Sequence, residues 1–168
     1  MQLIPNIDDL IVALYFIVPA YTTNSTSLLL GGGKPIDFEA RFIDGERIFG
    51  AHKTINGFLG GLAFGTMTAL VEELTFERGL GLTGFLVALG SVLGDLAGAF
   101  VKRRAKISPG NPLPVIDQLD FVAGALLLSY PFANYPLGMI VFVVLVTPPF
   151  HILTNAIAYV LKIKGAFW

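Results

Sequence analysis

The sequence predicts an all-α integral membrane protein with five transmembrane helices. Of its 168 residues, 54% are hydrophobic and only 14% are charged, and the mean hydropathy is +0.73, far from the composition of soluble domains. Five apolar stretches are long enough, or nearly so, to cross about 30 Å of hydrocarbon as helices of roughly 20 residues. The absence of cysteine excludes disulfides and thiolate chemistry. The net charge of −1 argues against nucleic acid binding.

Each apolar stretch has features that favour a membrane helix. No basic residue precedes the first, so we expect it to remain as a helix rather than to be cleaved as a signal. The second and third carry glycines at every fourth position, which lets neighbouring helices approach closely. The fourth is short and meets Pro131 and Pro136, and the fifth contains the pair Pro148-Pro149. The stretches are residues 7–30, 55–74, 81–101, 121–135 and 137–161, and the glycines are Gly57, Gly61 and Gly65, then Gly90, Gly94 and Gly98.

The distribution of basic residues predicts the orientation of the helices, because short loops rich in Lys and Arg face the cytoplasm. With five spans and the N-terminus outside, ten of the 11 basic residues lie on the cytoplasmic side and only Arg78 lies opposite. The C-terminus is then cytoplasmic. Two charged loops, residues 31–54 and the segment between residues 101 and 121, face the same compartment. We expect them to form one site, within a single transmembrane catalytic domain of residues 1–168.

The first charged loop contains candidate ligands for a phosphate. Asp44 and Arg47 lie in the turn-rich run DGERIFG, and Lys53 and Thr54 lie at the first turn of the second helix. A helix that begins there directs its free N–H groups and positive dipole end toward the cytoplasm, which stabilises a phosphate. Lys53-Thr54 lacks the glycine spacing and the preceding strand of a P-loop, so that motif is rejected. The alternative for Lys53 is a basic anchor at the lipid headgroups.

The third helix has a carboxylate beside its glycine stripe. Asp95 precedes Lys102 by seven residues, which is two turns and about 10 Å along one helical face. An ionisable group in a spanning helix indicates a function or a buried partner. The alternative is an ion pair between Asp95 and one of the basic residues that follow it. These are Lys102, Arg103, Arg104 and Lys106.

Two further carboxylates precede the fourth apolar stretch. Asp117 and Asp120 are three residues apart and share one helical face, although an N-cap and a first-turn acid would also explain them. Carboxylates of this kind suit Mg²⁺, which is usually held by one or two carboxylates, waters and substrate phosphates. We predict a metal site of Asp95, Asp117 and Asp120, with Asp95, Lys102, Arg103 and Asp120 as the catalytic residues.

Several ordered blocks of the sequence resemble the CDP-archaeol synthase family, which is related to the bacterial CDP-diacylglycerol synthases. The blocks are NST at residue 24, GGGKPID, DGERIFGAHKT, GSVLGDLAGAFVKRRAKI, IDQLDFVAGAL and PPFHILTNAIAYVLKIK, and they span nearly the whole chain. The resemblance implies a Mg²⁺-dependent CTP:lipid-phosphate cytidylyltransferase of phospholipid biosynthesis in the cell membrane. It implies CTP and 2,3-di-O-geranylgeranylglyceryl phosphate, an unsaturated archaeal ether lipid, as substrates, and CDP-archaeol and pyrophosphate as products.

In this interpretation the polar residues near the cytoplasmic face bind the nucleotide or the lipid headgroup. Asn24 lies late in the first helix, where a hydrogen bond between helices is the alternative. His151 and Asn155 share one face of the fifth helix, and hydrogen bonds between helices are favoured for this pair. The predicted nucleotide ligands are Asn24, Asp44, Arg47, Lys53, Thr54, Arg104 and Lys106.

Two other functions fit parts of the same pattern. A CTP-using lipid kinase of the dolichol-kinase type would share the basic cavity and the metal, but it would transfer the γ-phosphoryl group and release CDP. A small anion transporter would line a path across the bilayer with its charges. The outer connections are almost free of basic residues, which argues against that path.

Overall fold

A computed structural model describes residues 5–76, 81–108, 111–160 and 162, and Arg78 lies outside them. Within the described residues the chain forms five α-helices and no β-strand, so the predicted all-α class and the number of helices are confirmed. A short 3-10 helix, η1, extends the fourth helix. The elements are α1 (Ile7–Leu29), α2 (Ile55–Phe76), α3 (Leu82–Arg104), α4 (Ile116–Ser129), η1 (Tyr130–Phe132) and α5 (Leu137–Val160).

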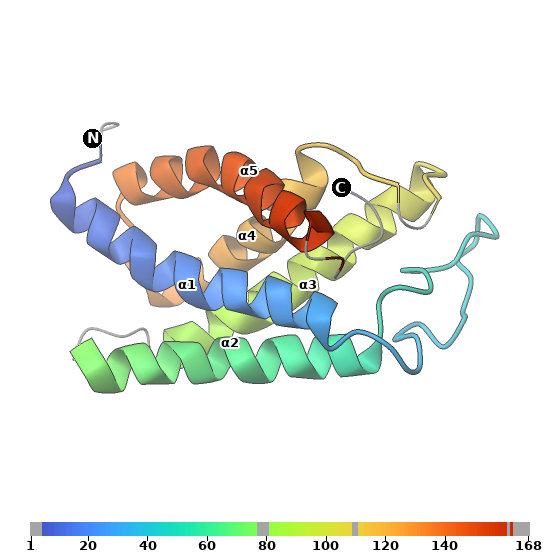
Figure 1. Ribbon diagram of the computed structural model, residues 1–168, viewed down its shortest axis with the longest axis horizontal. Coiled ribbons are helices and arrows are strands. Elements are labelled where there is room, and N and C mark those ends of the chain that lie inside the picture. The colour runs from blue at the N-terminus through green and yellow to red at the C-terminus, as the bar shows by residue number, and fades with distance from the viewer. Residues whose placement is uncertain (1–4, 77–80, 109–110, 161, 163–168) are drawn as a thin grey trace.

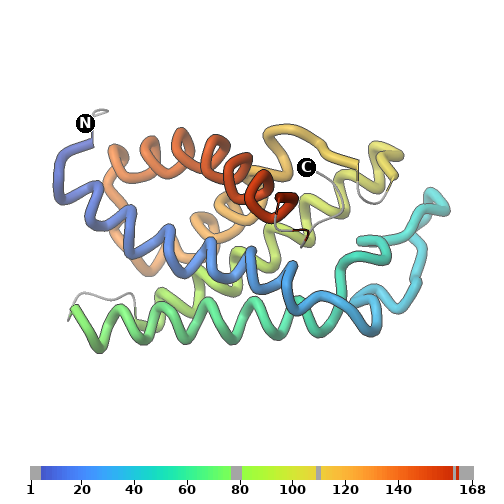
Figure 2. Tube along the Cα trace, viewed as in Figure 1, coloured from blue at the N-terminus to red at the C-terminus, as the bar shows by residue number. Residues whose placement is uncertain are grey.

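Successive helices run in alternating directions along the bundle (Figures 1 and 2). The loop of residues 31–54 and the segment between α3 and α4 therefore lie at the same end, which we call the loop end. The core of the bundle is apolar and includes the fully buried side chains of Phe16, Val87, Phe121, Met139 and Val143.

Two of the described helices, α3 and α5, are long and apolar enough to cross a membrane. The other three do not meet these criteria. For α4 the reason is length, because its 14 residues extend only about 21 Å at 1.5 Å per residue. The sequence predicted five membrane spans. The structure contains five α-helices in its described residues, and two of them have the length and apolarity of a span.

The glycine stripes lie at helix interfaces, as predicted. On α2, a Cβ atom added to Gly61 would meet the carbonyl oxygen of Thr23 in α1 at 2.8 Å. On α3, Gly90 and Gly94 pack against the backbone around Gly124 of α4, where no added Cβ atom would fit. These close approaches join α1 to α2 and α3 to α4, as small residues commonly do between membrane helices.

The boundaries of α4 differ from the prediction. We expected residues 121–135, but the α-helix begins at Ile116 and ends at Ser129. The prediction relied on apolarity and therefore began at Phe121, whereas the first residues of the helix include Asp117, Gln118 and Asp120. The N-cap position is Val115, in the left-handed region with φ 71°, and no side chain caps the helix. The alternative that Asp117 is an N-cap is therefore wrong, because Asp117 lies inside the first turn.

Candidate active site

An ion pair between Lys53 and Asp95 connects the start of α2 to the middle of α3. The Nζ atom of Lys53 lies 2.6 Å from each carboxylate oxygen of Asp95. Burial alone would lower the pKa of Lys53, but Asp95 and, more weakly, Asp120 and Asp117 outweigh it, so this pKa lies above its ordinary value. Lys53 is therefore a cation at neutral pH. The expected alternative, a pair between Asp95 and the basic residues after it, is replaced by a partner from the first loop.

A second ion pair joins Lys102, near the end of α3, to Asp117 in the first turn of α4. The Lys102 Nζ atom lies 2.9 Å and 2.7 Å from the two carboxylate oxygens. Asp117 also accepts a hydrogen bond from the backbone N–H of Leu113, at 2.8 Å. This carboxylate consequently fixes both the lysine and the chain that leads into α4.

Asp120 belongs to α4, its side chain faces α3, and it has no ion pair among the described residues. Its Oδ1 accepts the backbone N–H of Phe121 at 2.6 Å, and its Oδ2 occupies the space that a side chain at Gly98 would fill. Asp95, Lys53 and Asp117 are close enough to act on it electrostatically. The glycine at position 98 thus provides room for a carboxylate next to the Lys53–Asp95 pair.

The first loop is organised around Asp37, a residue that the sequence analysis did not single out. Its buried carboxylate accepts hydrogen bonds from the Arg47 guanidinium and from the backbone N–H groups of Phe49, Gly50 and Glu39. Burial opposes ionisation of Asp37, but these donors outweigh it and hold its pKa at about 2. Arg47 was predicted to bind the nucleotide, and in the structure it pairs with Asp37. The only signal of this role in the sequence was the position of an Asp in a turn-rich loop.

Arg104 fastens the same loop to the end of α3. Its Nε lies 2.6 Å from a carboxylate oxygen of Asp44, and an Nη atom donates to the carbonyl oxygen of Arg47 at 2.8 Å. The guanidinium also stacks on Phe42 and Phe100, at 4.9 Å and 4.7 Å from the ring centroids. Contacts of this type between a cation and an aromatic face are stabilising. Asp44 and Arg104 therefore hold the loop in place.

Arg103 is a buried cation that the loop covers. Only 6% of the residue is exposed, and its Nε has no hydrogen-bond partner among the described residues. The guanidinium packs on Gly50, whose φ of 100° favours glycine and whose carbonyl oxygen accepts the Lys53 N–H at 3.3 Å. Burying a charge is costly unless it is paired and hydrogen-bonded. This arrangement therefore suits an anion supplied from outside the chain.

The other predicted nucleotide ligands have different environments. Thr54 caps α2, because its hydroxyl accepts the N–H of Gly57 at 3.2 Å, and it also accepts the N–H of Gly32. Asn24 is half-buried on α1, and no hydrogen bond or ion pair between described residues links it to the charged cluster. Lys106 is exposed beyond the end of α3. The structure therefore brings Lys53, Asp95, Lys102, Asp117 and Asp120 together and leaves Asn24 and Lys106 outside this charged cluster.

The carboxylates of the charged cluster fit Mg²⁺ only as a partial ligand set. The described residues contain no group of three or more acidic, His or Cys side chains arranged around one metal position. Asp95 and Asp117 each bind a lysine, whereas Asp120 has no cationic partner in the described chain. One or two carboxylates are nevertheless the usual protein share of a magnesium site that also contains waters and substrate phosphates. Asp120, together with Asp95 or Asp117, satisfies that requirement.

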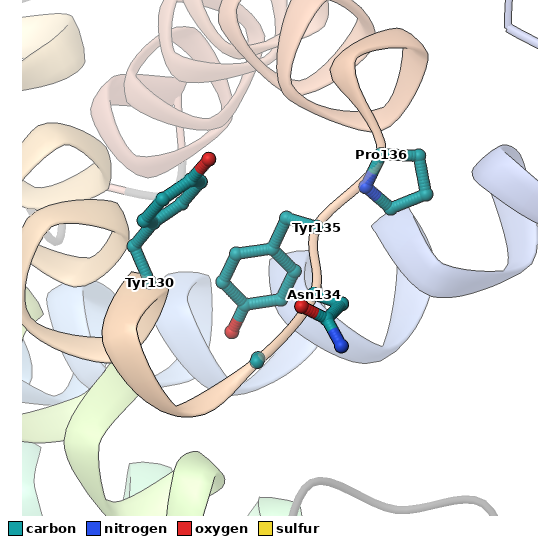
Figure 3. A pocket seen from close by; sticks show the side chains of 5 residues that line it. Tyr130, Asn134, Tyr135 and Pro136 are labelled. Atoms are coloured by element: carbon teal, nitrogen blue, oxygen red, sulfur yellow. The ribbon is translucent and has the colours of Figure 1, made fainter.

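Two cavities lie away from the charged cluster. One, of about 370 Å³, is lined by Tyr130, Ala133, Asn134, Tyr135 and Pro136, where η1 leads into α5 (Figure 3). The other, of about 290 Å³, lies between Pro5 and the apolar face of α5. No residue of the charged cluster lines either of them.

The fold and the charged cluster define an α-helical membrane protein with cations and carboxylates gathered at one end of its bundle. A solved structure described as an intramembrane enzyme for archaeal membrane lipid biosynthesis has a similar fold, with a TM-score of 0.82 and 35% sequence identity over 90% of this chain and 96% of that chain. The sequence model of the CarS-like family, CDP-archaeol synthase, matches residues 6–168.

Individual relatives agree with this match. The CDP-archaeol synthase of Pyrococcus furiosus is 42% identical over 161 residues, which cover 93% of this chain and 96% of that protein. The CDP-archaeol synthase of Methanocaldococcus jannaschii is 37% identical over 172 residues, covering 95% and 97%. The chain belongs to the CDP-archaeol synthase family of enzymes.

Proposed function

We propose that the protein transfers a cytidylyl group from CTP to the phosphate of an unsaturated archaeal ether lipid, 2,3-di-O-geranylgeranylglyceryl phosphate, and releases pyrophosphate. The name of its relatives, CDP-archaeol synthase, supports the cytidylylated lipid as the product. The structural observation that carries the proposal is the buried Arg103 guanidinium, whose Nε lacks a partner among the described residues. A phosphate oxygen is the natural partner for such a donor.

The reaction is a single displacement at phosphorus. An oxygen of the lipid phosphate attacks the α-phosphorus of CTP, a new P–O bond forms, and the bond from the α-phosphorus to the oxygen that bridges to the β-phosphorus breaks. Pyrophosphate leaves with that electron pair. A phosphate monoester is already anionic near neutral pH, so the attacking oxygen needs no general base. The reaction therefore requires neither a nucleophilic side chain nor a general base in the charged cluster.

The contribution of the chain is therefore positioning and charge neutralisation. Arg103 would bind the triphosphate under the Gly50 turn, and Lys53 and Lys102 would exchange a carboxylate for a phosphate oxygen. Asp120 with Asp95 or Asp117 would hold Mg²⁺. When bound, this ion would supply neutralisation of the negative charge that develops on the phosphates.

The site would face the cytoplasm of a multi-pass protein of the cell membrane. The excess of basic residues at the loop end supports this orientation, with the N-terminus outside and five spans, since Lys and Arg accumulate on the cytoplasmic side. In this orientation a soluble nucleotide reaches the loop of residues 31–54, while the acceptor lipid reaches the same end of the bundle from the bilayer.

Product analysis tests the proposal. Purified protein in detergent micelles would receive CTP labelled in its cytosine, Mg²⁺ and either the ether-linked or an ester-linked lipid phosphate. We expect label in the lipid phase and release of pyrophosphate, with the ether lipid preferred. Release of CDP, with the label left in water, would instead identify a lipid kinase. Absence of both products, together with uptake of anions into sealed vesicles, would identify a transporter.

A further inference from the structure

The turn at Gly50 covers the guanidinium of Arg103. A Cβ atom added to Gly50 would lie 3.5 Å from an Nη atom and 3.7 Å from the Cδ atom of Arg103, so the missing side chain allows a close approach. Gly50 is buried and has a φ of 100°, a conformation that favours glycine. The Nε of Arg103 has no hydrogen-bond partner among the described residues. The position of the Gly50 turn therefore determines the space in which an anion can reach this guanidinium.

Two side chains fix the backbone that leads into this turn. Arg104, at the end of α3, donates to the carbonyl oxygen of Arg47 at 2.8 Å. Asp37, from the loop itself, accepts the N–H groups of Phe49 and Gly50 at 3.1 Å and 3.0 Å, both at its Oδ2. Loss of this acceptor would leave the N–H groups of a covered turn unsatisfied, which costs free energy. Asp37 therefore holds the part of the loop that lies against the guanidinium.

Backbone strain accompanies this arrangement. Phe38 and Glu39, which follow Asp37 in the chain, have φ angles of 47° and 65°, and non-glycine residues rarely adopt positive φ. The Oδ1 of Asp37 accepts the Glu39 N–H at 3.1 Å, so the carboxylate that holds the Gly50 turn also supports the strained residues. Such strain persists where the surrounding contacts fix the backbone, and it is common near functional sites. The strain points to a role for Asp37 beyond the stability of the loop.

We propose that Asp37 is a positioning residue for the nucleotide, which holds the Gly50 turn where Arg103 can bind the triphosphate. The inference rests on the proposed function and deepens it, since it adds a residue to the nucleotide site. The Asp37 side chain has no solvent exposure, so it acts through the turn and does not touch the nucleotide. Arg47 is the counter-ion of Asp37 in this arrangement.

Initial-rate kinetics of Asp37→Asn test this role, with Glu46→Gln as the matched control. Asparagine keeps the size of the side chain but removes its charge and one acceptor, whereas Glu46 is an exposed acid of the same loop. We expect the KM for CTP to rise about tenfold in Asp37→Asn, the effect of losing one hydrogen bond of ordinary strength. The KM for the lipid phosphate and the kcat at saturating CTP should stay within about twofold of wild type, as should every constant of the control.

A double-variant cycle separates positioning from a general loss of stability. If Asp37 acts through Arg103, the KM for CTP of Asp37→Asn/Arg103→Gln lies within about threefold of that of Arg103→Gln alone, because residues that act as one unit are not additive. A further tenfold rise in the double variant would overturn the inference. An unchanged KM for CTP in Asp37→Asn, or an equal rise in the KM for both substrates, would also overturn it.

A second single variant keeps the test independent of the folding of Asp37→Asn. Gly50→Ala leaves the carboxylate intact and adds a methyl group next to Arg103 at a φ that disfavours alanine. It should displace the turn and raise the KM for CTP selectively, and an unchanged KM in this variant would contradict the role of the turn. Failure of the wild type to form a cytidylylated lipid would instead refute the proposed function.

Discussion

The network around Asp37 makes a quantitative prediction about the first loop. The carboxylate has a folded-state pKa of about 2 against an ordinary value of 3.8, because Arg47 and three backbone N–H groups outweigh the cost of burial. The substitution Asp37→Asn keeps the size of the side chain and removes its charge. It also presents an N–H group to donors that need an acceptor.

The shift in pKa gives the expected size of the effect. A difference of slightly less than two pH units at 1.36 kcal/mol per unit corresponds to about 2 kcal/mol of stabilisation of the folded loop. A loss of about 2 kcal/mol makes local opening roughly 30-fold more frequent. The helices pack through their own glycine and apolar contacts, so we expect the unfolding temperature of the bundle to change little.

Hydrogen exchange of the backbone amides of Phe49 and Gly50, which donate to Asp37, measures this opening directly. At pH 7 we expect these amides to exchange roughly 30-fold faster in Asp37→Asn than in the wild type. Glu46→Gln is the control, because it removes one exposed negative charge from the same loop and leaves the network intact. Exchange of these two amides within twofold of wild type in Asp37→Asn would refute the role of this carboxylate.

Four further predictions concern the charged cluster and the loop. Asp95→Asn should abolish turnover while circular dichroism shows an unchanged helix content, and measurable turnover would remove Asp95 from the chemistry. Arg103→Gln should raise the KM for CTP at least tenfold, because hydrogen bonds from charged donors contribute about 1.5–3 kcal/mol, and an unchanged KM in initial-rate measurements would contradict its role. Gly98→Ala inserts a methyl group where the Asp120 carboxylate lies, so kcat should fall while CTP binding, followed by calorimetry, persists. The stabilisation from Asp37 is present above about pH 4 and is lost as the pH falls toward 2, so exchange of the loop amides, corrected for the intrinsic rate, should accelerate in that window in the wild type but not in Asp37→Asn.

The sequence predicted the features that depend on local pattern. Apolar stretches identified five helices, and glycines at every fourth position identified the faces where α1 meets α2 and α3 meets α4. Both patterns are local. Apolarity indicates whether a short segment is surrounded by other apolar groups, and glycine spacing indicates where a neighbouring helix can approach closely. The gathering of Lys53, Asp95 and Asp120 was also anticipated, since alternating helices bring both charged segments to one end.

The pairing of charges could not be read from local pattern. Asp95 bonds to Lys53, which is 42 residues away, rather than to the cations on its own helix, because the loop places the lysine beside the middle of α3. Asp37 was missed for the same reason, since its donors converge only after the loop has folded. The true start of α4 was missed because hydropathy does not detect helical turns built from acidic residues.

The cations at the loop end differ in their partners. Arg47 and Arg104 are bound to Asp37 and Asp44, so they maintain the loop. The Lys53 and Lys102 pairs are only partly buried, with side-chain exposures of 29% and 14% for the two lysines. Both pairs therefore keep some contact with solvent at the loop end.

Under the proposed function, an incoming triphosphate can therefore bind Arg103 without breaking any described ion pair, and can then compete with Asp95 and Asp117 for the two lysines. Each exchange replaces a carboxylate by a phosphate oxygen as the partner of the lysine. It also leaves a carboxylate without a cation next to Asp120. The net negative charge around Asp120 thus increases only after the nucleotide has entered. Binding of the nucleotide is thereby coupled to binding of a hard cation.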